Sequence, residues 1–168
     1  MAITPKIMAW SECEIEIGTT GANDAMASTL SSVGTIKDKS STLEPSDGEV
    51  MEAKMTGGHT VAKEVQEGGF TLKTRVIEPD NTLFTTLGLG ETSSGEFHVK
   101  THLVAGDFSV QVTPKNVGAI GIKAPKCSVA FKPGWSEEEG NFVDLEFEIL
   151  YGAGGYWYSR FTKVAAGG

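Results

Sequence analysis

Apolar and polar residues alternate one by one in two stretches near the ends of the chain, residues 10–17 and 142–150. In the first stretch Glu12, Glu14 and Glu16 alternate with Cys13, Ile15 and Ile17. In the second, Asp144, Glu146 and Glu148 alternate with Val143, Leu145, Phe147 and Ile149. Strand side chains point alternately to opposite faces, so each stretch predicts a half-buried strand with an outer stripe of carboxylates. A solvated face explains one stripe, whereas two indicate a surface that works by being acidic.

The same alternation, broken by regularly spaced turn residues, predicts the remaining strands. They are expected at residues 33–39, 49–56, 70–78, 96–103, 107–113, 117–122 and 126–132, with another in the aromatic tail between 155 and 164. Residues 59–67 continue the strand character less regularly, and polar residues 40–48 predict a turn. One short α-helix is expected over residues 80–88, with Asp80 as its N-cap and Gly88 at its end. About nine strands and one helix predict a mainly β fold, an antiparallel β-sandwich or rolled barrel.

Composition and charge narrow the classes of function. The 168 residues suit a single domain over residues 1–168. The chain has 22 acidic and 14 basic residues, which give a formal net charge of −8. Its sequence contains no cluster of basic residues that could bind phosphates. Specific nucleic-acid binding is therefore not expected. No apolar run approaches the roughly 20 residues of a membrane helix, and the N-terminus lacks the apolar core of a secretory signal. No membrane partner is expected, and the folded chain is predicted in the cytoplasm of the cell that makes it or in a particle assembled there.

No motif for catalysis, a cofactor or a metal stands out. His98 and His102 lie four residues apart, but on a strand that spacing spans about 13 Å, too far for one metal ion. The glycines from Gly152 to Gly155 follow a strand but precede another strand, where a dinucleotide fingerprint needs a helix. An enzyme is the least expected class, and no catalytic residue, cofactor or metal is predicted.

Aromatic residues gather near the C-terminus, at Tyr151, Tyr156, Trp157 and Tyr158. Set among glycines, they suit a segment that docks on a neighbouring subunit, and equally a plug for one end of the chain's own core. A platform for stacking sugar rings, together with Trp135, is a third interpretation. Flexible arms are predicted at residues 1–9 and 152–168.

The order of these features resembles the major tail tube proteins of long-tailed bacteriophages and the related tube proteins of contractile injection systems. The most suggestive stretch runs from Asn116 through Val129. It continues past the turn at Glu137–Glu139 into the acidic strand at residues 143–149. The resemblance covers most of the chain and consists of a pattern of strands and turns.

This resemblance implies a structural subunit and not an enzyme. Tail tube proteins form a β-sandwich or rolled barrel with a flanking helix, and they assemble into hexameric rings that stack into a hollow tube for DNA or effector passage. Copies of the chain and other tail proteins are then the expected partners. The implied localisation is the host cytoplasm before assembly and a virion tail or tail-like particle afterwards. The segments expected to reach neighbouring subunits are residues 1–9, 152–168 and either the 40–49 turn or the 56–69 hairpin.

The acidic stripes gain a purpose from this resemblance, because a lumen lined with carboxylates repels DNA phosphates. We expect either Glu12, Glu14 and Glu16 or Asp144, Glu146 and Glu148 to face the lumen. The other stripe would lie outside or pair with Lys54, Lys73 or Arg75 on adjacent strands. The alternatives are another virion component (a neck, terminator or decoration protein) and a small-ligand or carbohydrate-binding β-sandwich.

Overall fold

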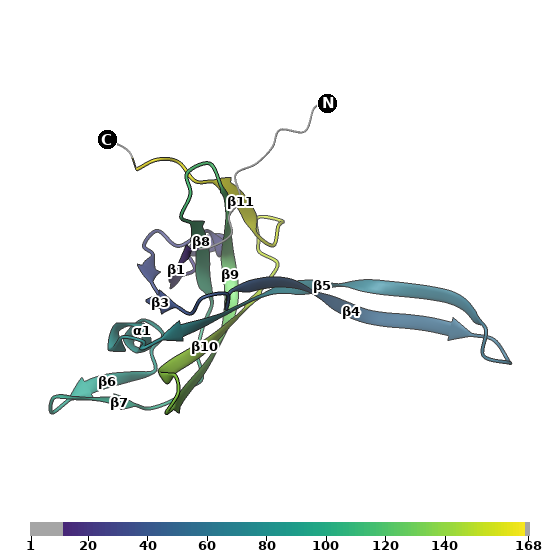
Figure 1. Ribbon diagram of the computed structural model, residues 1–168. Helices are drawn as coiled ribbons and strands as arrows, with labels where there is room; N and C mark the ends of the chain where they lie inside the picture. The colour runs from purple at the N-terminus through teal and green to yellow at the C-terminus, as the bar shows by residue number, and fades with distance from the viewer. Residues whose placement is uncertain (1–11, 167–168) are drawn as a thin grey trace.

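The computed structural model describes residues 12–166 and shows a mainly β fold with one short α-helix (Figure 1). Its elements are β1 (Cys13–Thr19), a 3-10 turn (Ala22–Asp24), β2 (Ser31–Ser32), β3 (Thr35–Ile36), β4 (Thr42–Lys54), β5 (Thr60–Ile77), α1 (Asn81–Thr86), β6 (Gly90–Ser93), β7 (Glu96–Val99), β8 (Phe108–Pro114), β9 (Ile120–Ser136), β10 (Gly140–Ile149) and β11 (Ser159–Thr162). They form one large antiparallel sheet and the small β6–β7 hairpin. The predicted fold class is therefore confirmed.

The large sheet is rolled until its two ends meet. Its strand order is β2-β1-β8-β9-β10-β5-β3, with β11 added to β9 and β4 added to β5. The end strands β2 and β3 are separated in sequence only by Val33 and Gly34. Gly34 has a φ of 111°, which glycine adopts without strain, and this turn carries the chain from one end of the sheet to the other. The short 31–36 segment therefore joins the two ends of the sheet.

The core of this roll is made by the apolar positions of the alternating strands. In β10, Val143, Leu145, Phe147 and Ile149 are at most 1% exposed, as are Ile15 and Ile17 in β1. Phe131 of β9 and Leu72 and Val76 of β5 complete the same cluster. The intervening acidic residues of β1 and β10 consequently point outward, as the alternation predicted.

Helix α1 forms where the sequence predicts it. The Asp80 carboxylate accepts a hydrogen bond from the Thr82 backbone N–H at 2.9 Å, which satisfies one of the free donors of the first turn. Leu83 and Leu87 are buried, and the Phe84 ring packs edge-on against Phe131 at 5.0 Å between centroids. The helix thus covers one flank of the roll beside β6 and β7.

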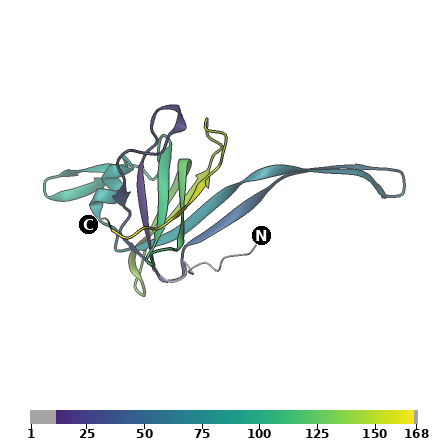
Figure 2. The same cartoon turned by 90° about the horizontal axis from the view of Figure 1, so that it is seen from above.

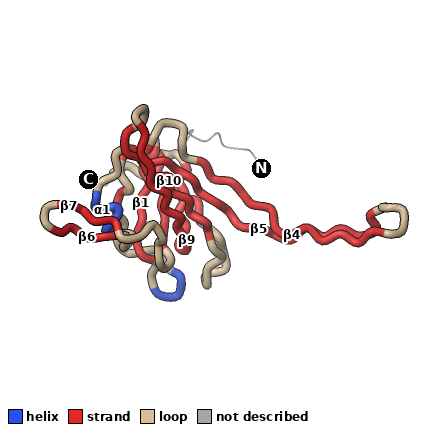
Figure 3. Tube along the Cα trace, turned by 90° about the horizontal axis from the view of Figure 1, so that it is seen from below, coloured by secondary structure: helices blue, strands red, loops and turns tan. Residues whose placement is uncertain are grey.

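The most conspicuous feature is a long hairpin of β4 and β5 that leaves the body as a two-stranded ribbon (Figures 1 and 2). Within β5, residues 60–67 are exposed, whereas the residues from Gly68 onward are half-buried or buried, except for the exposed Lys73. We call residues 48–67 the distal hairpin. Figure 3 shows it as continuous strand up to a loop at the tip, projecting away from every other element.

Two sequence expectations differ from the structure, and in both a strand continues past a proline. Residues 42–48 of the predicted turn belong to β4, and the predicted strands 117–122 and 126–132 merge into one strand, β9, that begins at Ile120. Pro45 lies beside a register shift between β4 and β5, and Pro125 lies beside a similar shift between β8 and β9. Bulges accommodate a residue that lacks an N–H, so the strands continue through them.

Candidate functional surfaces

The second acidic stripe, on β10, is largely neutralised by neighbouring strands. The Arg75 guanidinium donates to both carboxylate oxygens of Asp144, with Nε–Oδ1 at 2.7 Å and Nη2–Oδ2 at 3.0 Å. Glu146 pairs with Lys132 at 3.2 Å and lies opposite Lys73 in the register with β5. Glu148 is exposed. This face therefore carries mixed charge, which matches the expected pairing with Arg75.

Arg75 also links the β9–β10 turn to β3. Its Nη1 donates to Glu139 at 2.6 Å, and Glu139 is paired with Lys37 as well. The guanidinium stacks over the Phe142 ring, 4.3 Å from its centroid. The hydrogen bond from Lys37, followed by the charges of Lys37 and Arg75, lowers the pKa of the Glu139 carboxyl. Of the acidic turn at residues 137–139, Glu139 is thus a structural residue.

We expect Glu139→Gln to flatten the pH dependence of stability on the acidic side. A carboxyl whose pKa is lowered on folding stabilises the native state above its ordinary pKa of 4.5, and that stabilisation is lost as the pH falls through the lower folded value. Urea unfolding between pH 7 and pH 3 measures this slope. The exposed neighbour Glu138 offers a matched control, since Glu138→Gln is expected to keep the parent profile. Identical slopes in all three proteins would contradict the role of Glu139.

The first acidic stripe, on β1, lacks such compensation along most of its length. Glu12, which is 74% exposed at its side chain, pairs with Lys115 at 3.0 Å. Glu14 lies opposite Thr113, and Glu16 lies between Gln111 and Ser32. Among residues 12–166 no cation pairs with Glu14 or Glu16. Partial burial, followed by the charge of Glu14, raises the pKa of Glu16. On β1, these two carboxylates therefore form an acidic surface without a paired cation among the described residues.

The C-terminal aromatic residues divide into two kinds. Trp157 and Tyr158 are half-buried and pack edge-on against Phe70, with ring centroids at 5.9 Å and 5.1 Å. Tyr151 and Tyr156 are 58% and 43% exposed, and Tyr151 packs against Trp157 at 5.3 Å. The contacts of Trp157 and Tyr158 are therefore made within the chain, whereas docking of the two tyrosines on a neighbour stays a prediction.

The predicted arms are placed only in part. The N-terminal arm, residues 1–9, lies outside the described residues. The C-terminal segment differs from a free arm, because Ser159–Thr162 pair with β9 as β11. The strand predicted between residues 155 and 164 is thus confirmed, while its partner, β9, could not be identified from the local pattern.

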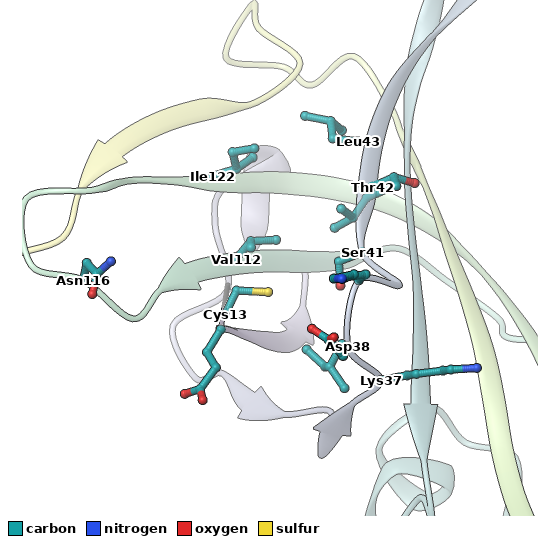
Figure 4. Close-up of a pocket in the computed structure, with 13 residues that line it drawn as sticks. Cys13, Lys37, Asp38, Ser41, Thr42, Leu43, Val112, Asn116 and Ile122 are labelled. Carbon is teal, nitrogen blue, oxygen red and sulfur yellow. The ribbon is translucent and has the colours of Figure 1, made fainter. Parts of the chain in front are cut away.

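An open groove of about 1180 Å³ lies at the mouth of the roll (Figure 4). Its apolar floor is formed by Cys13, Ile36, Leu43, Leu72, Val112 and Ile122. Lys37, Asp38 and Lys39 line its rim, and burial raises the pKa of the Cys13 thiol. The buried Cys127 lies apart, and both cysteines are free thiols. The aromatic residues predicted as a sugar platform are not part of this groove.

The distal hairpin carries exposed apolar side chains on both of its faces. Val50 and Val65 form a cross-strand pair and are 47% and 57% exposed. Met51, on the opposite face, is 50% exposed. The sequence predicted two strands here but not their length, because Pro45 and Gly48 were taken as a turn. The signal that could have found the hairpin is the lack of a regular buried face between residues 59 and 67.

The histidines lie on exposed strand and loop positions. His98 is on β7, where its Nε2 is 3.2 Å from the Ser93 carbonyl, and His102 is outside the strand. Within the described part of the chain, no group of three or more His, Cys, Asp or Glu side chains is placed to hold a metal ion. Across the same residues, no helix has the length and apolar character needed to cross a membrane.

Comparison with known proteins adds no family assignment. No protein-family model matches the chain, and no curated protein is significantly similar to it in sequence.

Proposed function

We propose that this chain is a non-enzymatic structural subunit of a phage-like tail tube, in which copies form rings, hexameric by the family resemblance, that stack into a hollow tube. The observation that carries the proposal is the distal hairpin. A two-stranded ribbon in water is at best marginally stable, and ordering each backbone residue costs roughly 1–2 kcal/mol. Residues 60–67 have exposed side chains and gain little packing from the body in return. A ribbon of this kind is expected to be stabilised by another subunit.

The chemistry of the hairpin favours a second copy of the chain as that partner. Its exposed valines and methionines supply apolar contact area, and no strand within residues 12–166 pairs with either of its outer edges. A hairpin that reaches well beyond its own subunit suits contact between successive rings. Other tail proteins would bind at the ends of the tube, and the subunit would be cytoplasmic before assembly and part of the particle afterwards.

The charge pattern supports one choice of lumen surface. On β10, Asp144 and Glu146 are paired with cations, so that stripe has little net charge to repel DNA. On β1, the carboxylates of Glu14 and Glu16 have no paired cation within residues 12–166. We therefore assign the β1 stripe to the lumen and the β10 stripe to a surface facing solvent or a neighbouring subunit.

Negative-stain electron microscopy of the purified protein over a range of concentrations, beside sedimentation velocity, tests the proposal. Open-ended tubes with a central channel are expected at high concentration. Closed rings that never stack would instead favour a neck or terminator protein. A monomer at every concentration, even when purified tail-tip complexes are supplied as initiators, would overturn the tube function.

A second candidate function, binding of a small apolar ligand, rests on the groove at the mouth of the roll. Its volume of about 1180 Å³ exceeds what one drug-sized ligand needs, and its floor is apolar. The groove is open, and charged side chains, among them Lys37, Asp38 and Lys39, line it beside the apolar floor. Protection of the Cys13 thiol from alkylation by an added ligand would favour this function over the tube.

A further inference from the structure

The point at which the hairpin leaves the body is built to hold one geometry. The register between β4 and β5 shifts on both sides of position 47. Next to these shifts, the Ser46 hydroxyl lies 3.0 Å from both backbone groups of Gly69, accepting from its N–H and donating to its carbonyl. At Gly48 a Cβ would lie 2.2 Å from the Gln66 carbonyl oxygen, so the two strands approach more closely than any other residue permits. We call residues 45–48 and 67–70 the hairpin root.

The C-terminal segment packs directly on this root. Phe70 is paired with Pro45 in the register, and both Trp157 and Tyr158 stand edge-on against its ring. The Trp157 ring also covers Gly69, where an added Cβ would come within 3.4 Å of it. Tyr151 supports the outer side of Trp157, and its hydroxyl donates to the Gly155 carbonyl at 2.9 Å.

The segment is itself anchored to the body, which makes it suitable as a brace. Immediately after Tyr158, β11 pairs with residues 120–123 of β9, a strand at the centre of the sheet. Gly152, before the aromatic residues, is buried and lies near Asp24. Trp157 and Tyr158 are therefore held from both sides while they contact the hairpin root.

We propose that Phe70, Trp157 and Tyr158 form a bracket that fixes the direction in which the distal hairpin projects, so that the C-terminal segment is a positioning element for subunit stacking. Edge-on aromatic pairs are directional, and they stiffen a root where two bulges would otherwise let the ribbon bend. The consequence for stacking rests on the proposed function. The orientation of the hairpin within one subunit does not.

The test measures a distance between spin labels in dilute, monomeric protein. Labels are attached at Glu64→Cys on the hairpin and at Glu137→Cys on the β9–β10 turn, in a Cys13→Ser background. Cys127 is fully buried, and burial raises its pKa to about 12, so it does not react. The parent is expected to give one narrow distance distribution. Trp157→Leu and Tyr158→Leu are expected to broaden it at least twofold, and Trp157→Phe is expected to restore most of it.

Matched controls separate the bracket from a general loss of packing. Tyr156→Leu and Trp135→Leu remove exposed aromatic side chains that do not contact the root, and both should leave the distribution narrow. Ser46→Ala perturbs the root without changing the aromatic cluster, and it is expected to broaden the distance distribution. This variant takes the place of the Trp157 variant if that protein fails to fold. A narrow distribution in folded Trp157→Leu and Tyr158→Leu proteins would overturn the proposal. Because the labels report on monomers, that result is independent of whether tubes form.

Discussion

A chain in which residues 48–67 are replaced by Asn-Gly is expected to fold normally and to form no tubes. In the register Asp47 pairs with Glu67, the last residue removed, so residues 47 and 68 lie on adjacent strands and can be joined by Asn-Gly, which favours a tight two-residue hairpin turn. The removed residues make little contact with the core, so the thermal unfolding midpoint should move by only a few degrees. Electron microscopy and sedimentation, under conditions in which the parent protein assembles, measure the loss of tube formation.

A milder variant separates the apolar contact from the length of the hairpin. Val50→Thr with Val65→Thr keeps two β-branched side chains at a cross-strand pair but removes apolar surface that a partner would bury. Losing burial of two partly exposed valines should raise the concentration needed for assembly by roughly tenfold or more. Val99→Thr, at a valine 53% exposed on β7 and outside the hairpin and both predicted arms, is the matched control and should assemble like the parent. Tubes formed by the Asn-Gly variant would exclude the hairpin as the stacking element.

The sequence was sufficient for the parts of the fold that depend on local alternation. β1 and β10 were predictable because every second residue is apolar and buried, and α1 because Asp80 and Gly88 mark its ends. These signals come from residues within one element. They do not depend on which strand lies beside it.

The parts that were missed depend on pairing between distant segments. β4 and β9 continue through Pro45 and Pro125 because a partner strand accommodates each bulge, and no local pattern reports that partner. Likewise, the pairing of Asp144 with Arg75 joins residues 69 positions apart. The two acidic stripes look equivalent in the sequence and differ only in their neighbours.

Among the described residues, the β10 carboxylates Asp144 and Glu146 are paired with cations, whereas Glu14 and Glu16 on β1 are not. Partial burial and the Glu14 charge raise the pKa of Glu16, and a carboxyl of this kind destabilises the fold as the pH rises above its ordinary value of 4.5. Folding alone does not favour two adjacent uncompensated carboxylates on β1. Their retention is explained if the surface must remain negative in the assembled state.

We expect Glu14→Lys with Glu16→Lys to convert tubes that ignore DNA into tubes that bind it. The two substitutions change the charge of each subunit by four, and a ring multiplies the change by its number of subunits. Lysines that contact phosphates release counterions, so binding should weaken steeply between 50 and 200 mM salt, by roughly 10³-fold or more for six or more contacts. Co-sedimentation of tubes with short labelled duplex DNA across that salt range measures both effects.

The matched control places the same charge change elsewhere. Glu138→Lys with Glu148→Lys alters two exposed carboxylates that have no paired cation among the described residues, on the β9–β10 turn and on β10. Because neither lies on β1, this variant should bind DNA only along the outside of the tube, where bound DNA remains open to nuclease. DNA held by the β1 variant should be protected. Equal binding and equal nuclease sensitivity in the two variants would mean that the β1 stripe does not line the lumen, even if the tubes themselves form.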